Sequence, residues 1–212
     1  MTGSAAEIVT ERRALSSKGR QTREAIEQSA RKLFAERGFH GTTLGEIMSA
    51  AGKSPGVFYR YFTDKEDLLA ALAEAFLHDV VEPSGLAVRL PHSPHDGEFF
   101  TGVVNGYWTM FKQNIGVMIA VAQLAATQQR FALLQNAFRR FGMDIVAASV
   151  RQAEQQGYGP GLDADHTAAA VALLFENFTT VFAGPSTPDW QISDADAVAT
   201  LATIWKRTLY GF

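Results

Sequence analysis

The chain has 212 residues, 47% of them hydrophobic, which is enough for a well-filled core in one domain or two small ones. It contains no cysteine, which excludes disulfides and thiolate metal sites, and it shows no membrane-spanning apolar run and no signal-peptide core, so we expect a cytoplasmic protein. The net charge is −3, but residues 1–65 carry 11 basic and 7 acidic side chains whereas residues 66–212 carry 8 and 15, so only the front of the chain is suited to meet phosphate.

The first 17 residues are polar and lack a sustained period, which predicts a flexible arm. Helical spacing of apolar residues predicts a helix over about 18–37, closed by Gly38. Two short helices are expected at about 44–51 and 55–61, and a longer one over 64–81. Three start signals support them: a capping box of Thr43 with Glu46, an N-cap at Ser54 before a proline, and a second capping box of Thr63 with Glu66.

Residues 82–95 hold three prolines and predict a loop. Long apolar helices follow, which we place at about 100–111, 117–126, 131–156, 163–182 and from Ser193 onward. No strand pattern competes with them. The expected fold is therefore all-α with nine helices, arranged as an N-terminal three-helix domain and a C-terminal helical domain.

Between the two short helices lies Ala51-Gly52-Lys53, a tight turn with glycine where a left-handed residue would end a helix. Two very short helices joined in this way favour a helix-turn-helix, which presents its second helix to the major groove of DNA.

These residues resemble the N-terminal signature of the TetR family of bacterial transcriptional repressors. The matching positions are Thr42, Thr43, Ala51, Gly52, Ser54, Gly56, Tyr59, Phe62, Lys65 and Leu68. The chain departs from the family pattern at Lys53, Met48 and Tyr61, where the family usually has a small apolar residue, an alanine and a histidine. The resemblance implies a nine-helix fold with a DNA-reading front, and a ligand-binding and dimerisation rear. We accordingly divide the chain into an arm over 1–17, a DNA-binding domain over 18–63 and a sensing and dimerisation domain over 64–212.

The candidate DNA-binding residues surround the turn and the second short helix: Thr42, Thr43, Lys53, Ser54, Pro55, Gly56, Tyr59, Arg60, Tyr61 and Lys65. The hydroxyls of Thr43 and Ser54 serve either as helix caps or as phosphate contacts. Arg60 suits guanine reading, because its guanidinium can bond O6 and N7 together, or it clamps phosphate. We expect Val57, Phe58 and Phe62 to be core.

Lys65 lies at the positive end of a helix dipole, which costs roughly 0.3–1 kcal/mol and which a nearby phosphate would offset. The family resemblance also makes Lys65 and Tyr59 phosphate contacts. The alternative for Lys65 is a solvated lysine. Arg20 and Arg23, with Arg12, Arg13 and Lys18, either reach the DNA backbone or minor groove or form a solubilising tail.

A homodimer is expected, because two reading helices about one DNA turn (roughly 34 Å) apart would read a pseudo-palindromic operator. The candidate interface lies on the last two helices, at Ala168, Ala172, Leu201 and Trp205, where small residues allow close approach. The alternative is an ordinary intramolecular core.

A small-molecule effector pocket is expected among the aromatic and interleaved polar residues of the rear. Its candidate residues are Asn105, Trp108, Thr109, Phe111, Gln123, Phe138, Phe141, Phe175, Asn177 and Phe178, with plain core as the alternative for each aromatic. Four helix-weakening glycines, at 102, 106, 116 and 142, would make room for a ligand or a neighbouring backbone.

The expected function is thus a DNA-binding repressor released by a small apolar or aromatic effector, with no cofactor and no metal. Two other classes remain: a ligand-binding protein without DNA function, and an activator. An enzyme would have to use His92, His95 and Asp96, or His78 and Asp79, which lie in or beside the proline-rich loop without an evident third ligand. We therefore expect no catalysis.

Overall fold

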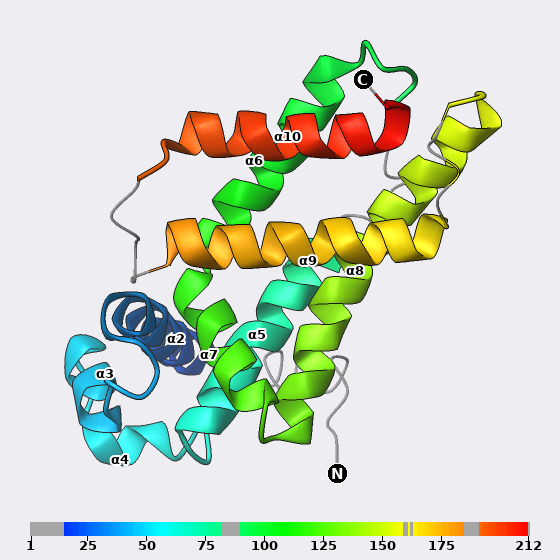
Figure 1. Ribbon diagram of the computed structural model, residues 1–212. Helices are drawn as coiled ribbons and strands as arrows, with labels where there is room; N and C mark the ends of the chain where they lie inside the picture. The colour runs from blue at the N-terminus through cyan, green and yellow to red at the C-terminus, as the bar shows by residue number, and fades with distance from the viewer. Residues whose placement is uncertain (1–14, 82–89, 159–160, 162, 185–190, 212) are drawn as a thin grey trace. The chain divides into compact units, whose positions relative to one another are not determined.

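A computed structural model describes residues 15–81, 90–158, 161, 163–184 and 191–211. Within these ranges all regular structure is helical, in agreement with the predicted all-α class. The helices are α2 (Ser17–Arg37), α3 (Leu44–Ala50), α4 (Pro55–Phe58), α5 (Lys65–Val81), α6 (Gly97–Gln113), α7 (Ile115–Ala125), α8 (Gln129–Gln155), α9 (Ala164–Ala183) and α10 (Asp194–Tyr210), labelled in Figure 1. Residues 1–14 of the predicted arm and 82–89 of the predicted 82–95 loop lie outside the described residues, and of the arm Ser16 caps α2 and Ser17 begins it.

The chain forms two compact units that are not contiguous in sequence. The head unit contains α2 to α5, α7 and the start of α8 through Gln135. The rear unit contains α6, the rest of α8, α9 and α10. The compact unit around the short helices is therefore larger than the predicted 18–63 domain, because α5 and α7 complete its core.

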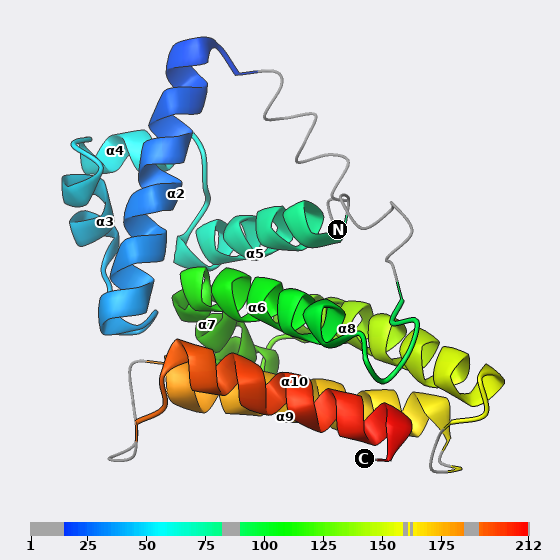
Figure 2. The same cartoon turned by 90° about the horizontal axis from the view of Figure 1, so that it is seen from above.

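In the head unit, α2 buries the face that the sequence pattern indicated, with Ile26, Ala30, Leu33 and Phe34 nearly inaccessible. Gly38 follows with φ of 73°, as predicted for the residue that closes this helix. The short helix α3 lies beside α2, and α4 packs against α3 (Figures 1 and 2). They contribute Ile47, Met48 and Phe58 to the same core.

Only one of the two predicted capping boxes forms. At the start of α3 the Thr43 side chain accepts from the Glu46 N–H, and the Glu46 carboxylate accepts from the Thr43 N–H at 2.8 Å. At the start of α5 the predicted Thr63–Glu66 box is replaced by Asp64, which accepts from the Asp67 N–H at 2.7 Å. The helix begins one residue later than that box requires, because the aspartate caps it.

In the rear unit, α6 packs most extensively against α10 and also contacts α9. Figure 1 shows α9 and α10 running in opposite directions with nearly parallel axes. Their shared core is aromatic, with the Trp205 ring edge-on to Phe100 at 5.2 Å between centroids. Ser193 caps α10 as predicted, accepting from the Asp196 N–H.

Candidate nucleic-acid interface

The turn between α3 and α4 has the backbone geometry that ends a helix sharply. Gly52 has φ of 64°, a left-handed conformation that glycine adopts without strain. Its N–H donates to the Ser49 carbonyl at 3.0 Å, and the Lys53 N–H donates to the Met48 carbonyl at 2.9 Å. This pair of bonds is the Schellman motif, so Gly52 fixes the angle at which α4 leaves α3.

The second short helix is shorter than predicted. Regular helix covers Pro55–Phe58, and hydrogen-bonded turns continue to Phe62, whose N–H donates to the Phe58 carbonyl at 3.1 Å. Ser54 stands at the N-cap position, but its side chain makes no capping hydrogen bond. Its hydroxyl is exposed and open to another acceptor or donor, as the phosphate alternative requires.

Seven of the ten candidate DNA-binding residues are exposed around this turn and helix: Thr43, Lys53, Ser54, Pro55, Gly56, Tyr59 and Arg60. Tyr59 is 66% exposed, the largest value among the exposed large hydrophobic residues described, while its neighbour Phe58 is 1% exposed. An aromatic ring held in solvent beside a buried one is available for contact with a partner. Lys53, the main departure from the family pattern, is also exposed, so its side chain faces solvent and is not packed.

Thr42 is placed differently from its prediction as a DNA contact. Its side chain is buried, and its hydroxyl donates to the Gly38 carbonyl at 2.8 Å, with the Leu33 carbonyl a further 3.3 Å acceptor. A hydroxyl carries one proton, so this group is committed inside the protein. Thr42 therefore joins the end of α2 to the start of α3.

Arg23 is also withdrawn from the surface, contrary to the expectation that it reaches DNA. Its guanidinium is bonded to Glu27 at 2.9 Å and lies 4.9 Å above the Phe62 ring. Arg20 is exposed, and it donates to the Leu15 carbonyl at 2.9 Å. Lys18 is exposed as well, whereas Arg12 and Arg13 lie outside the described residues.

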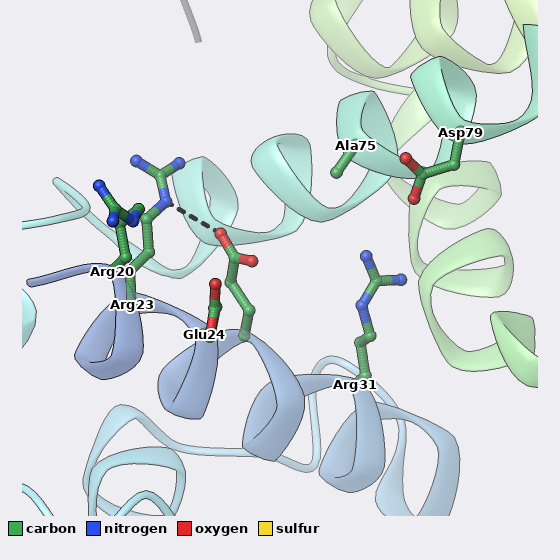
Figure 3. A pocket seen from close by; sticks show the side chains of 7 residues that line it. Arg20, Arg23, Glu24, Arg31, Ala75 and Asp79 are labelled. Atoms are coloured by element: carbon green, nitrogen blue, oxygen red, sulfur yellow. Dashed lines mark hydrogen bonds and ion pairs between the residues drawn. The ribbon is translucent and has the colours of Figure 1, made fainter. Parts of the chain in front are cut away.

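A groove of about 250 Å³ lies between α2 and α5 in the head unit (Figure 3). Its lining mixes both signs of charge and one small residue: Arg20, Arg23, Glu24, Glu27, Arg31, Ala75 and Asp79. Because three arginines and three carboxylates line it, the groove offers no field of one sign to an ion. Sequence reasoning did not indicate it, since its lining residues on α2 and on α5 are more than 40 residues apart in the chain.

The sequence model of the family described as bacterial regulatory proteins, tetR family, matches residues 26–72, which contain the helix-turn-helix. The transcriptional regulator EthR of Mycobacterium tuberculosis is 28% identical over 192 residues, covering 88% of this chain and 86% of EthR. The chain is thus similar to TetR-family regulators, in sequence over residues 26–72 and in fold over most of its length.

Two further comparisons cover different lengths of the chain. The transcriptional repressor AcnR of Corynebacterium glutamicum is 41% identical over 68 residues, which span 31% of this chain but only 36% of AcnR. A TetR-family regulator from Rhodococcus has the same fold, with a TM-score of 0.69 at 22% identity over 92% of this chain and 98% of its own. The named relatives are regulators of transcription and not enzymes.

The predicted effector-site residues fall into three groups. Trp108, Phe111 and Phe175 are buried, and Phe138, Phe141 and Phe178 are half-buried. The four polar candidates, Asn105, Thr109, Gln123 and Asn177, are exposed, so they do not supply polar groups to the interior. Gln123 also belongs to the head unit, unlike the other nine.

The rear unit does bury other polar groups. Among the described residues, four of its buried polar atoms form no hydrogen bond of standard geometry: the hydroxyls of Tyr107, Thr179 and Tyr210 and the indole nitrogen of Trp205. The Tyr107 ring lies 5.3 Å from Phe111 and 5.5 Å from Phe175. Burial raises the pKa of the Tyr107 hydroxyl, so it stays protonated and remains a donor. Thr179 was missed, although it continues the buried row Thr167, Val171, Phe175 at intervals of four.

The predicted dimer contacts lie mostly in the core of a single rear unit. Ala168, Leu201 and Trp205 are each at most 2% exposed there, and Ala172 is half-buried near Gly142. These residues are therefore packed by their own chain, and a partner cannot reach three of them. The exposed large apolar residues of α9 are Leu173, Leu174 and Val181, between 37% and 44% exposed. Val181 follows Leu174 by two helical turns, so the three share one side of the helix, away from its buried row.

The histidine pairs considered for metal or acid–base chemistry do not gather further ligands in the part of the chain that is described. No group of three or more His, Asp or Glu there is arranged to hold a metal ion. The Asp96 carboxylate accepts from the His92 N–H at 3.4 Å, within the turn that precedes α6. None of the helices within the described ranges is long and apolar enough to cross a membrane.

Proposed function

We propose that this TetR-family regulator is a cytoplasmic repressor that binds a pseudo-palindromic operator as a homodimer and is released by a small apolar or aromatic effector. The observation that carries DNA binding is the exposed set of Lys53, Ser54, Tyr59 and Arg60 around a turn fixed by Gly52. Repression is favoured by the 41% identity over 68 residues to the repressor AcnR. In this proposal residues 18–63 read DNA, 1–17 form an accessory arm, and 64–212 sense and dimerise.

The reading roles follow from side-chain chemistry. Arg60 reads a guanine edge or binds phosphate. Tyr59, Lys53 and the hydroxyls of Ser54 and Thr43 contact the phosphate backbone of the DNA. Gly56 lies at an open surface, because no atom of the protein lies within 4 Å of the place where its Cβ would be. Without a side chain there, the backbone of α4 can approach the duplex. One four-residue helix offers few base contacts, so specificity requires a second copy about one DNA turn (roughly 34 Å) away.

We assign dimerisation to the outer face of α9, with α10 beside it. Leu173, Leu174 and Val181 form an exposed apolar row on α9. Such a row on a helix that is also buried on its other side is typical of an interface with a second copy. The two α9 and two α10 helices would then form a four-helix bundle.

The effector site is proposed within the rear unit, among Trp108, Phe111, Phe175 and the half-buried aromatics. Supporting this, the buried hydroxyls of Tyr107 and Thr179 form no hydrogen bond of standard geometry within the described residues, and a buried hydroxyl left in that state costs about 1–3 kcal/mol. A ligand with an apolar body and one hydrogen-bonding oxygen would satisfy them. Such a ligand releases DNA only through its differential affinity for the two states, and a full switch needs about 5.5 kcal/mol.

The test is selection of bound duplexes from a random-sequence pool with the purified protein. We expect enriched half-sites with dyad symmetry and centres about 10 base pairs apart or a multiple of it. The affinity for the selected duplex should fall steeply with salt, since phosphate contacts release counterions. Absence of enrichment together with a flat salt dependence would instead support a ligand-binding protein without DNA function. Reporter expression with the operator before or behind the promoter separates repression from activation.

A further inference from the structure

Lys65 is the first residue of α5, and its ammonium group points back into the protein. Nζ donates to the Phe39 carbonyl at 2.7 Å and to the Thr42 carbonyl at 2.8 Å. It also lies 4.3 Å from the centroid of the Phe39 ring. Two of the three ammonium protons are therefore used on backbone that lies 23 and 26 residues earlier in the chain.

The segment that Lys65 holds is the connection from α2 to α3. Phe39 is buried, with its ring 5.3 Å from Phe34 of α2. Thr42 is buried and bonded to the Gly38 carbonyl, and Thr43 caps α3. Gly41 leaves no space for a side chain, because a Cβ there would collide with the Arg37 carbonyl oxygen. The connection is thus compact and specified, and Lys65 ties it to the next helix.

The same connection is fixed from α2 by a second cation. Arg37 bonds Glu46 at 2.8 Å, and Glu46 is the partner of Thr43 in the capping box. The N-terminal end of α3 is therefore held on one side by the last residue of α2 and on the other by the first residue of α5. Because the Gly52 turn fixes α4 on α3, whatever holds the start of α3 also orients α4.

We infer that Lys65 is a positioning residue, which sets the helix-turn-helix relative to α5 and so acts on DNA affinity through α3 and α4 and not by contacting phosphate. This inference rests on the proposed function, since it assigns a role within DNA binding. It also explains a cation in the first turn of a helix, where the dipole disfavours it: two carbonyl oxygens supply the compensating negative charge. Burial lowers the pKa of Lys65, in keeping with an ammonium drawn away from water.

The first experiment needs no DNA. Hydrogen exchange of residues 39–50 would be compared among wild-type protein, Lys65→Met and Lys32→Met, at a temperature where circular dichroism shows all three folded. Lys32 is the matched control, since its side chain is 75% exposed on α2 and the same charge is lost. We expect at least tenfold faster exchange in Lys65→Met alone. Unchanged exchange in this segment would overturn the inference.

The second experiment uses the duplex that wild-type protein selects from the random pool. For Lys65→Met we expect affinity at least about tenfold weaker, which corresponds to about 1.4 kcal/mol, with the slope of log K against log salt unchanged relative to Lys32→Met. A slope whose magnitude is smaller by about one would identify Lys65 as a phosphate contact and overturn the inference. Faster exchange with unchanged affinity would overturn it as well.

A third measurement covers the case in which Lys65→Met does not fold. In ¹⁵N-lysine-labelled wild-type protein without DNA, the Lys65 ammonium protons should exchange with water measurably more slowly than those of Lys32. Equal exchange rates for the two ammonium groups would overturn the inference that Lys65 is held by the Phe39 and Thr42 carbonyls. If the random pool yields no enriched duplex, the proposed function fails, while the exchange measurements still decide whether Lys65 holds the connection.

Discussion

Gly116, in the first turn of α7, lies against the backbone of α2. A Cβ at this position would lie 2.5 Å from the Phe34 carbonyl carbon and 2.7 Å from the Ala35 Cα, with the Ala35 nitrogen closer still. Backbone atoms cannot rotate away as a flexible side chain can. We expected four glycines to make room for a ligand or a neighbouring backbone. Gly116 makes room for the backbone of α2, whereas no atom lies within 4 Å of a Cβ placed at Gly102 or Gly106.

Gly116→Ala is therefore expected to lower the free energy of unfolding by about 1–3 kcal/mol, the usual cost of overpacking. Gly102→Ala, on α6, is the matched control and should raise it by up to about 1 kcal/mol, because alanine favours the helix and the added methyl meets nothing. Urea unfolding of both variants measures the difference. Equal stability of the two would mean that α7 does not approach α2 as closely as described.

Glu74 of α5 is a half-buried side chain whose carboxylate has an incomplete set of hydrogen-bond partners among the described residues. Its Oε1 lies 3.6 Å from Arg130, and its Oε2 is buried without a hydrogen bond. Burial raises the pKa of Glu74 above 4.5, and this exceeds the opposing effect of Arg130. The folded state therefore binds the proton more tightly than the unfolded chain. The resulting stabilisation is complete below about pH 4.5 and is lost as the pH rises through the folded-state pKa.

The variant Glu74→Gln stays neutral and should lose this pH dependence. Relative to wild type, its free energy of unfolding should rise between pH 4 and pH 7, by an amount on the order of 1 kcal/mol for an unpaired buried group. Arg130→Met should steepen the wild-type pH dependence, because it removes the charge that lowers the Glu74 pKa. Urea titrations at several pH values measure both. Parallel profiles for all three proteins would contradict the prediction.

At the scale of the elements, α5 begins with an aspartate cap where the sequence suggested a threonine. Asp64 accepts from the Asp67 N–H, and the Asp67 carboxylate in turn accepts from the Thr63 N–H at 3.0 Å. Asp64→Ala should therefore cost about 0.5–2 kcal/mol of stability, the typical price of losing a helix cap. Thr63→Ala should change it by less than about 0.5 kcal/mol, as for a surface position. Thermal unfolding compares the two, and a larger loss in Thr63→Ala would restore the original assignment.

The helices themselves were well predicted from the sequence, and their caps less so. Ile26, Ala30, Leu33 and Phe34 recur at 3.6-residue spacing, and local periodicity of this kind depends only on one face being buried. Thr63 and Glu66 have the same capping-box spacing as Thr43 and Glu46. That spacing does not show that Asp64, one residue further on, is the residue that caps the helix. Starts and ends are therefore decided by competition between adjacent side chains.

The candidate site was predicted in part for a similar reason. The exposed residues Lys53, Tyr59 and Arg60 stand beside a glycine turn whose geometry the sequence specifies locally. Thr42 and Arg23 could not be assigned in that way, because their burial depends on carbonyls and rings contributed by other segments. On α9 both sides carry apolar residues, so periodicity alone did not tell the face covered by its own chain from the exposed one.

At the scale of the whole molecule, the exposed row on α9 makes the oligomeric state testable. Leu174→Glu places a charge in the proposed interface, and we expect sedimentation to show a monomer where wild type is a dimer. Affinity for the selected duplex should fall by at least about tenfold, since a monomer reads one half-site. Leu133→Glu is the control: Leu133 is 55% exposed on α8, outside the rear unit. A monomer from Leu133→Glu, or a dimer from Leu174→Glu, would refute the assignment to α9.

The division into units has a practical consequence for exchanging parts between relatives. A graft joined after residue 82 would separate α2 and α5 from α7 and the start of α8, which belong to the same compact unit. It would replace Gly116 where the α2 backbone tolerates no side chain, and remove Arg130 from beside Asp67 and Glu74. A hybrid regulator that keeps this DNA specificity must therefore inherit residues 116–135 together with the front of the chain. The sensing part taken from another regulator would therefore have to replace two separate segments, 83–115 and 136–212.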